Sequence, residues 1–334
     1  MSEPVVWPTV WVVCDDKQGI TNQCVGLAEA IGATPIVKYV RPRWPWRWLP
    51  AAWWPAPLRA QRRDAAPLAP PWPDLIIVAG RTGFAPAVEI RRRAAGKTLL
   101  VAIQNPRMAP ENFDLIVMPS HDTLEAPNVL HTEGAPHRVT AARLAEAARR
   151  FAPLFAPLAR PLVAVLVGGS NRFYRLDAAV AAEIGGALAA FARRHRVSLA
   201  VTPSRRTEPA VRAALQHALA DVPAWFWDGS GDNPYFGLLG LADTVIVTAD
   251  SVSMVSEAAV TGKPVYVLEL PGRGGKFAAF HARMRERGIT RPFTGAFETW
   301  RYPPLDDMPR AAAAIRRLLA ERHPTPQPLA ASAG

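Results

Sequence analysis

The stretch from Thr244 to Leu270 constrains the fold more than any other part of the chain. It begins with a β-branched run typical of a buried parallel strand, passes through the small polar residues 249–253, and then shows helical spacing up to Thr261-Gly262. A glycine there is a common helix end, and the buried run 265–268 follows. This order predicts a strand–loop–helix–strand unit of a doubly wound sheet, whose polar loop can hold an anionic ligand. The alternative is an ordinary βαβ unit in which the Ser and Glu residues only cap the helix.

The same alternation of short apolar runs and helical spacing recurs along the chain. The predicted strands are 8–13, 36–40, 74–79, 98–103, 113–118, 162–167, 197–202 and 224–227. A helix at Val139–Leu158 and a linker at Ala159-Arg160-Pro161 separate two series of such units. We therefore predict an α/β fold with two Rossmann-like, doubly wound parallel-sheet domains. The predicted boundaries are 1–158 and 162–305 for the domains, 306–322 for a helix that packs back on the first domain, and 323–334 for a frayed tail.

Composition narrows the class of protein. A length of 334 residues suits two domains with separate cores, and 49% hydrophobic with 20% charged residues indicates a globular chain. No apolar run is long enough for a membrane span, and the first apolar run lacks the basic flank of a signal peptide. The only cysteines, Cys14 and Cys24, suit a reducing compartment without disulfides. We expect a cytoplasmic protein.

The formal net charge of +11 calls for an anionic partner, which is a nucleic acid, an anionic membrane surface or a phosphorylated substrate. The chain has no zinc-finger spacing and no aromatic RNP-type strand, so no nucleic acid is expected. Its seven histidines show no metal-site spacing, so neither a metal nor a cofactor is expected. The membrane and the phosphorylated substrate are left.

Residues 41–63 form the most unusual segment, with five of the eleven tryptophans, six arginines, five prolines and no acidic residue. The prolines argue against a regular helix. Indole and guanidinium groups together are typical of membrane contact at headgroup depth, which would place the protein on the inner face of the membrane. The alternative is a loop whose tryptophans cover the core of its own domain while the arginines face solvent. The sequence leaves both interpretations open.

Polar residues follow several predicted strands of the first half. Because parallel strands end at the same edge of a sheet, we expect these strand ends to converge. The candidates for a catalytic group there are Asp15, His121 and Asp122. The other polar candidates at this edge are Gly19, Asn22, Gln23, Arg81, Gln104 and Arg107.

Two loops of the second half have anion-binding features. The turn 168–171 (Gly-Gly-Ser-Asn) follows a strand, and its glycines would let backbone amides approach a phosphate. It is neither a Walker loop nor a Rossmann fingerprint, and alone such a turn is more often structural. The loop 250–254 would lie at the same sheet edge, and Arg205 and Arg206 end a third strand there. Guanidinium groups suit a diphosphate, although exposed arginine is the default reading of such a pair.

The order of elements in the second half resembles the donor-binding half of GT-B-fold glycosyltransferases, most closely those that use UDP-sugars on lipid-linked acceptors. The residues that carry the resemblance are the 168–170 turn, Asn233-Pro234-Tyr235, Ala242-Asp243, Ser256-Glu257 and Gly262-Lys263-Pro264. It implies that Glu257 holds the ribose and that the two loops hold the diphosphate. The implied donor residues are Gly168, Gly169, Ser170, Asn171, Arg205, Arg206, Asn233, Tyr235, Asp250, Ser251, Val252, Ser253, Met254 and Glu257.

Almost the whole chain also resembles the mitochondrial fission ELM family. This resemblance is carried by Gly19, Asn22-Gln23, Gly26-Leu27, Gln104-Asn105-Pro106-Arg107, Pro119-Ser120-His121-Asp122, the 168–170 turn and the run 248–257. Plant members of that family act at the mitochondrial surface by recruiting a dynamin-like fission protein. Two residues depart from the GT-B pattern: Ile20 stands where many lipid-acceptor enzymes have histidine, and Ser251 where they have glycine.

Two hypotheses follow. The first is a metal-independent GT-B hexosyltransferase that binds a nucleotide-diphosphate sugar in an interdomain cleft, with the first domain facing a lipid-linked or other acceptor at the cytoplasmic membrane surface. The second is a non-catalytic, membrane-associated adaptor that recruits a partner protein.

Overall fold

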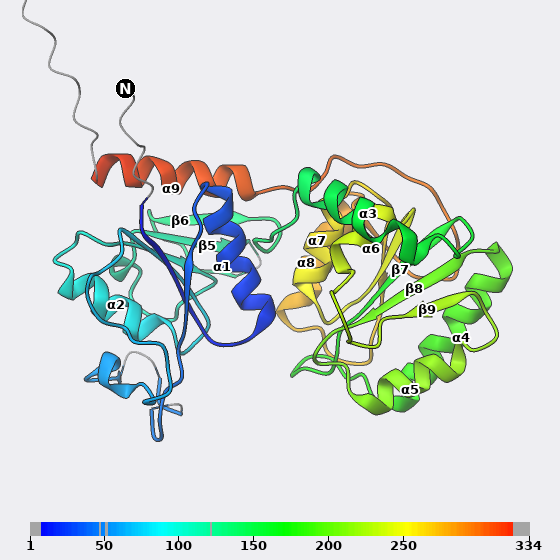
Figure 1. Cartoon of the computed structure of the whole chain (residues 1–334), viewed down its shortest axis with the longest axis horizontal. Coiled ribbons are helices and arrows are strands. Elements are labelled where there is room, and N and C mark those ends of the chain that lie inside the picture. The colour runs from blue at the N-terminus through cyan, green and yellow to red at the C-terminus, as the bar shows by residue number, and fades with distance from the viewer. Residues whose placement is uncertain (1–7, 47, 51–52, 121, 323–334) are drawn as a thin grey trace, which may run out of the picture. The chain divides into compact units, whose positions relative to one another are not determined.

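The computed structural model describes residues 8–46, 48–50, 53–120 and 122–322 (Figure 1). The chain forms two compact units. Unit 1 comprises Met1–Thr132, Pro136–Arg138 and Asp307–Gly334, and unit 2 comprises Glu133–Ala135 and Val139–Asp306. Within the described ranges, no helix combines the length and the apolar character that crossing a bilayer requires.

Unit 1 is built on a parallel sheet of order β2-β1-β3-β4-β5-β6. Its strands are β1 (Val10–Cys14), β2 (Ile36–Tyr39), β3 (Leu75–Ala79), β4 (Leu99–Ile103), β5 (Leu115–Pro119) and β6 (Val129–Thr132). Its helices are α1 (Gln18–Ala30), α2 (Phe84–Arg93) and α9 (Met308–Arg322), with short 3-10 helices η2 (Pro57–Ala60) and η3 (Pro110–Asn112). The strand order reverses between β1 and β3, which makes their carboxyl ends the switch point of this sheet.

Helices cover both faces of the unit 1 sheet (Figure 1). Alternate residues of a strand point to opposite faces. Accordingly, Val10 and Val12 of β1 belong to a core shared with α1 and α9, whereas Trp11 and Val13 belong to a core shared with α2. A strand buried on both sides explains the continuous apolar runs in the sequence.

Unit 2 is built on a second parallel sheet, of order β12-β11-β10-β7-β8-β9. Its strands are β7 (Leu162–Val167), β8 (Ser198–Pro203), β9 (Ala224–Phe226), β10 (Thr244–Thr248), β11 (Val265–Leu268) and β12 (Thr290–Pro292). Its helices are α3 (Ala141–Phe155), α4 (Ala178–His195), α5 (Pro209–Ala218), α6 (Tyr235–Leu241), α7 (Val252–Ala259) and α8 (Lys276–Glu286). The order reverses between β7 and β10, so the loops after these two strands meet at the switch point.

Helix α3 belongs to unit 2, although the sequence boundary at 158 groups it with the first half. Two glycines of α6 explain this packing. A Cβ atom on Gly240 would lie 2.7 Å from the Leu144 carbonyl oxygen, and one on Gly237 would lie 2.8 Å from the Phe151 ring. The absence of side chains at these positions lets α3 and α6 approach closely.

The prediction of two Rossmann-like α/β units is confirmed, but several elements differ from the expected ones. Helix α1 begins at Gln18, shortly after the end of β1 at Cys14. Burial of Thr21 and Gln23 on the same face as Cys24 and Leu27 extends the helix over Gly19. Strands β6 and β12 and helix α8 were not predicted: both strands are short, and alanine and arginine interrupt the apolar spacing of the helix.

Candidate functional site

The loops that follow β7 and β10 meet at the switch point of the unit 2 sheet. Residues 168–171 follow β7, and residues 249–251 lead from β10 into α7. The amide of Gly168 donates to Thr248 Oγ1 at 2.8 Å, which ties the end of β7 to the end of β10. Both loops therefore form one structural unit at the place where doubly wound sheets bind ligands.

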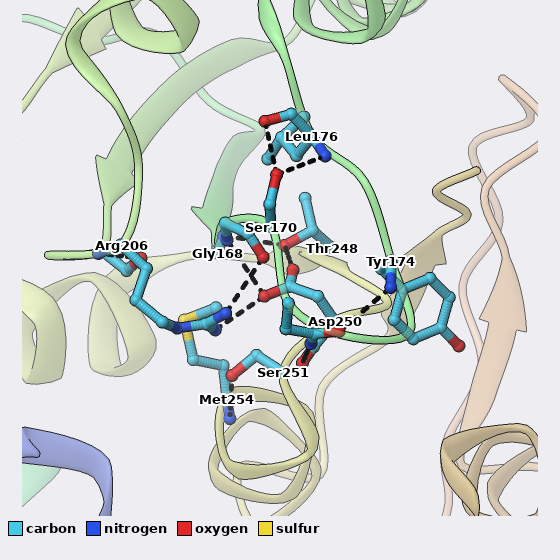
Figure 2. A network of polar contacts seen from close by, with 12 residues as sticks. Gly168, Ser170, Tyr174, Leu176, Arg206, Thr248, Asp250, Ser251 and Met254 are labelled. Atoms are coloured by element: carbon cyan, nitrogen blue, oxygen red, sulfur yellow. Dashed lines mark hydrogen bonds and ion pairs between the residues drawn. The ribbon is translucent and has the colours of Figure 1, made fainter. Parts of the chain in front are cut away.

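The carboxylate of Asp250 lies at the centre of this unit (Figure 2). Its side chain is completely buried. Oδ1 accepts a hydrogen bond from Thr248 Oγ1 at 2.7 Å, while Oδ2 accepts from the Gly169 amide at 3.0 Å and from Arg206 Nη2 at 2.7 Å. A carboxylate is stable in such a place only when its oxygens are satisfied. Asp250 thus holds the loops together and does not present its oxygens to a ligand.

Glycine is required at both positions after β7 by close approach. A Cβ atom on Gly168 would lie 2.1 Å from Asp250 Oδ2, and one on Gly169 would lie 2.3 Å from the Arg206 carbonyl oxygen. The sequence suggested that these glycines expose their amides to a phosphate. Instead, both amides point into the loop, because the side chains of Thr248 and Asp250 already accept from them.

Ser170 and Asn171 fix the outer part of the same loop. Ser170 Oγ accepts from the Leu176 amide at 2.9 Å, and Asn171 Oδ1 accepts from the Phe173 and Tyr174 amides at 2.8 and 3.0 Å. Asn171 Nδ2 also donates to the Asp250 carbonyl at 3.2 Å. The two polar side chains therefore organise the loop into a fixed shape.

The N-terminus of α7 is the part of the site best suited to an anion. Ser251 caps the helix, since its Oγ accepts from the Met254 amide at 3.3 Å. Val252 and Ser253 occupy the first turn, where the helix dipole favours negative charge. Arg206 adds a guanidinium group that is 45% exposed and is held in place by Asp250 and the Gly169 carbonyl.

A buried acid lies one turn further along α7. The carboxylate of Glu257 is buried, and its Oε2 accepts a hydrogen bond from the Tyr235 hydroxyl of α6 at 2.5 Å. Burial raises the pKa of Glu257 to about 7, although the Tyr235 hydrogen bond opposes this shift. Burial also raises the pKa of Tyr235, so the phenol remains the donor. Just before α6, Asn233 Oδ1 accepts a hydrogen bond from the Tyr235 amide at 3.0 Å.

A third loop, 271–276 (Pro-Gly-Arg-Gly-Gly-Lys), joins this site but was not singled out from the sequence. Its signal was the combination of three glycines with two basic residues after an apolar run. The Arg273 amide donates to the Phe173 carbonyl at 3.1 Å, and a Cβ atom on Gly272 would lie 2.0 Å from that oxygen. The loop is therefore interlocked with residues 173–175, and Arg273 lies beside them.

His281 of α8 holds the loop between β10 and α7 through a hydrogen bond to its backbone. This side chain is buried, and its Nε2 donates to the Ala249 carbonyl at 2.8 Å. Burial lowers the pKa of His281, which favours the neutral ring. The sequence contained no sign of this role, because the residue lies in a helix that its pattern did not predict.

In unit 1, polar side chains gather at the switch point between β1 and β3. Asp15 follows β1, and a Cβ atom on Gly80, which follows β3, would lie 3.0 Å from its carboxylate. Among the described residues, neither Asp15 Oδ1 nor Thr82 Oγ1 has a hydrogen-bond partner, although both atoms are buried. Gln104 Nε2 donates to Gln23 Oε1 at 3.1 Å, and the backbone of Gln104 has a φ of 72°. Such a conformation is costly for a residue other than glycine and is frequent at functional sites.

The other described candidates of unit 1 lie on α1 or follow β3, β4 and β5. Gly19 and Asn22 lie on α1, where Asn22 Oδ1 accepts from Gln18 at 2.9 Å. Arg81 and Arg107 are exposed at the ends of β3 and β4, and Asp122 follows β5. His121 lies outside the described residues. In unit 2, Arg205 is exposed beside Arg206.

No group of three or more His, Cys, Asp or Glu side chains within the described ranges is arranged to hold a metal ion. Among the described residues, the two sites present a helix N-terminus, guanidinium groups and carboxylates.

Comparison with known proteins places the chain in a family. The model of the mitochondrial fission ELM1 family matches residues 18–319. The chain belongs to this family. It is 37% identical over 277 residues to the mitochondrial fission protein ELM1 of Arabidopsis thaliana, a match that covers 75% of this chain and 65% of the plant protein. The chain thus spans slightly less than two thirds of that relative. An uncharacterized protein of Rickettsia prowazekii (strain Madrid E) is 25% identical over 356 residues, covering 92% of this chain and 97% of that one.

Solved structures similar to this ELM1 family member include two UDP-GlcNAc 2-epimerases. The enzyme of Neisseria meningitidis, bound to UDP-GlcNAc, matches with a TM-score of 0.54 at 15% identity and covers 94% of this chain and all of its own. The enzyme of Methanocaldococcus jannaschii matches with a TM-score of 0.57 at 9% identity, covering 93% and 99%. At such identities the likeness concerns the fold, and it confirms the GT-B-like architecture.

Proposed function

We propose that unit 2 binds a nucleotide-diphosphate sugar and that the protein transfers the sugar, without a metal ion, to an acceptor at a membrane surface. In this proposal the diphosphate lies at the N-terminus of α7 and the ribose diol donates hydrogen bonds to Glu257. The observation that carries the proposal is the buried Glu257 carboxylate, one turn beyond the capped N-terminus of α7 at the switch point of the sheet.

The environment of Glu257 supports a role in holding a diol. Burial of a carboxylate is unfavourable unless hydrogen-bond donors stabilise its charge, and here burial outweighs the Tyr235 hydroxyl enough to raise the pKa to about 7. Two ribose hydroxyls would supply the missing donors. In the free protein the ionised Glu257 carboxylate would thus remain destabilised by burial, and hydrogen bonds from a bound ribose would stabilise it.

The surroundings of the helix support a diphosphate. The first turn of α7 offers backbone amides, Arg206 is held close by Asp250, and Arg205 lies beside it. Helix N-termini and guanidinium groups can stabilise a leaving diphosphate without a metal. The structurally similar epimerase of Neisseria meningitidis is described as bound to UDP-GlcNAc, which supports a UDP-sugar as the first ligand to test.

The acceptor would be held by unit 1. Asp15 has one buried oxygen without a hydrogen-bond donor among the described residues, and Gln23 and Gln104 form an amide pair at the same sheet edge. A hydroxyl of the acceptor could donate to Asp15, which would then act as the general base. His121, Asp122, Arg81 and Arg107 remain further candidates for this side.

The second candidate function is a non-catalytic, membrane-associated adaptor that recruits a partner protein. The 37% identity to the plant mitochondrial fission protein favours it. The two candidates differ in what they require of Glu257. An adaptor that needs no nucleotide would keep its phenotype in a Glu257→Ala variant, whereas a transferase would lose its donor.

A thermal-unfolding panel tests the proposal. UDP, GDP, CMP, ADP and their sugars are added to the full chain and to two variants, Glu257→Ala and the control Glu183→Ala, which removes an exposed acid of α4. A ligand at about 100 times its dissociation constant adds about 2.7 kcal/mol, which raises the unfolding temperature by several degrees. We expect one nucleotide to stabilise the wild type and Glu183→Ala but not Glu257→Ala. If no nucleotide or nucleotide sugar of the panel raises the unfolding temperature of the wild type, the transferase proposal is refuted.

A further inference from the structure

The described residues 41–46, 48–50 and 53–63, here called the tryptophan loop, form a protrusion closed at its base. Pro42 and Gln61 pair as an antiparallel bridge. Next to this bridge, the Arg43 amide donates to the Ala60 carbonyl at 2.9 Å and the Arg62 amide donates to the Arg41 carbonyl at 2.8 Å. The loop stands beside α2 (Figure 1). Its two ends are therefore anchored to each other, and the residues between them form a separate surface feature of unit 1.

Two tryptophans make the small core of this loop. Trp54 is 6% exposed, its Nε1 donates to the Leu49 carbonyl at 3.3 Å, and its ring centroid lies 6.3 Å from that of Trp46. Together with Ala60, these side chains pack on Ala85 of α2. For Trp46 and Trp54, the interpretation that the tryptophans cover the core of their own domain is sufficient.

The other three tryptophans face solvent. Trp44, Trp48 and Trp53 are 77%, 68% and 71% exposed. They make up half of the exposed large hydrophobic side chains in the part of the chain that the structure describes, and all three lie within this one loop. Single exposed hydrophobic side chains are normal on a protein surface, but a cluster of exposed aromatic side chains marks an interaction site.

The charge around these indoles is of one sign. Arg41, Arg43, Arg59, Arg62 and Arg63 are exposed in the same loop. The nearest acid, Asp64, pairs with Arg62 at 3.0 Å and lies 4.0 Å from Arg41, so it neutralises only part of this charge. The surface therefore combines indoles, which favour the boundary between headgroups and acyl chains, with guanidinium groups, which pair with phosphate.

We propose that the tryptophan loop docks the protein on an anionic phospholipid membrane, with Trp44, Trp48 and Trp53 inserted at headgroup depth and the surrounding arginines on lipid phosphates. This inference deepens the proposed function by naming the surface at which it acts. A lipid surface fits better than a protein groove, because the indoles lie on a protrusion and not in a pocket, and a bilayer boundary accepts apolar groups to a depth of about 5–10 Å. The surplus positive charge complements anionic lipid and has no such general counterpart on a protein.

Sedimentation with vesicles tests the inference on the full chain, without nucleotide. The vesicles consist of phosphatidylcholine alone or of equal parts of phosphatidylcholine and phosphatidylglycerol. A triple variant replaces Trp44, Trp48 and Trp53 with Ala, and the control Leu154→Ala removes another exposed apolar side chain, 41% exposed, from unit 2. Because the replaced indoles are exposed, the triple variant should fold, which its unfolding temperature verifies.

We expect the wild type and Leu154→Ala to bind the anionic vesicles more tightly than the neutral ones, and added salt to weaken this preference. The triple variant should partition at least about tenfold more weakly, because the three indoles supply most of the apolar area that binding would bury in the bilayer. Equal partition of the triple variant and the wild type would overturn the proposal, and so would a wild type that binds neither vesicle. Stabilisation by nucleotides is measured in a separate experiment, so a negative vesicle result does not contradict the proposed nucleotide site of unit 2. If the folded triple variant instead loses a protein partner while vesicle binding is unchanged, the surface serves a protein and not a lipid.

Discussion

The buried acid of α7 should make the stability of the free protein depend on pH in an unusual direction. The pKa of Glu257 rises from 4.5 to about 7 because its carboxyl is buried, and only the Tyr235 hydroxyl opposes the shift. The folded state therefore binds a proton more tightly than the unfolded state between these two values. Stability falls with increasing pH wherever the folded state holds more protons.

The magnitude follows from the size of the shift. Each pKa unit corresponds to about 1.4 kcal/mol, so a rise from 4.5 to about 7 destabilises the folded protein by about 3 kcal/mol above pH 7, relative to pH 4. A Glu257→Gln variant keeps an acceptor for the Tyr235 hydroxyl but does not titrate. The free energy of unfolding of this variant should exceed that of the wild type by about 3 kcal/mol more at pH 8 than at pH 4.

Denaturant unfolding at a series of pH values measures this difference. Groups other than Glu257 titrate in both proteins and cancel when the two curves are subtracted. The exposed acid Glu183 provides the control, since Glu183→Gln should shift the curve by less than about 0.5 kcal/mol at any pH. A wild-type-minus-Glu257→Gln difference that stays flat from pH 4 to pH 8 would show that the carboxyl is not destabilised by burial, and the reasoning about its ligand would fail with it.

Other consequences of the structure concern stability. Gly168→Ala would bring a Cβ atom to 2.1 Å from the Asp250 carboxylate and should destabilise the protein by about 1–3 kcal/mol. Gly186→Ala places its Cβ atom in open space on α4 and should stabilise the protein by about 0.5–1 kcal/mol. Calorimetric unfolding of the two variants tests this contrast. Asp250→Asn removes the charge that Arg206 pairs with and should lower the free energy of unfolding by about 2–3 kcal/mol, measured in urea. This is less than for a wholly buried ion pair, because Arg206 is partly exposed. A decrease of less than about 0.5 kcal/mol would contradict the role assigned to Asp250. Burial alone would raise the pKa of Asp114, but hydrogen bonds from two guanidinium groups and a backbone amide lower it. The stability contributed by Asp114 is therefore present above pH 4 and lost as the pH falls through its folded pKa, so Asp114→Asn should make acid unfolding less steep, and an unchanged acid limb would contradict this.

Most of the fold could be predicted from the sequence because its strands are buried on both faces. Runs such as 162–167 and 244–248 contain no polar residue apart from threonine, which leaves few alternatives to a parallel sheet. The elements that were not predicted lack this signal. β12 has three residues and β6 is only half buried, so neither has a distinctive pattern.

The sequence predicts which types of residue form the site, but not where their amides and side chains point. A Gly-Gly-Ser turn after a strand suggests free amides, and nothing in the sequence shows that Asp250 and Thr248 turn back to accept from them. These contacts depend on side-chain geometry across two loops that lie 80 residues apart in the chain. The interlocked loop 271–276 was overlooked for the same reason, because its partner is Phe173 and not a neighbour in sequence.

The tryptophan loop illustrates a different limit. Composition identified 41–63 as unusual but could not separate membrane contact from self-covering. The structure divides the tryptophans between the two interpretations, since Trp54 packs on Ala85 while Trp44 remains 77% exposed. Only the packing against α2 distinguishes one indole from another.

Hydrogen–deuterium exchange with the stabilising nucleotide sugar tests the central claim most directly. If the diphosphate lies at the N-terminus of α7, the amides of its first turn, at Val252 and Ser253, should exchange more slowly in the complex. The amides of α5, which connects β8 with the edge strand β9, should be unchanged. The Gly168 and Gly169 amides, which already donate within the loop, should change little. Unchanged exchange in the first turn of α7, with slower exchange elsewhere in the chain, would contradict the account.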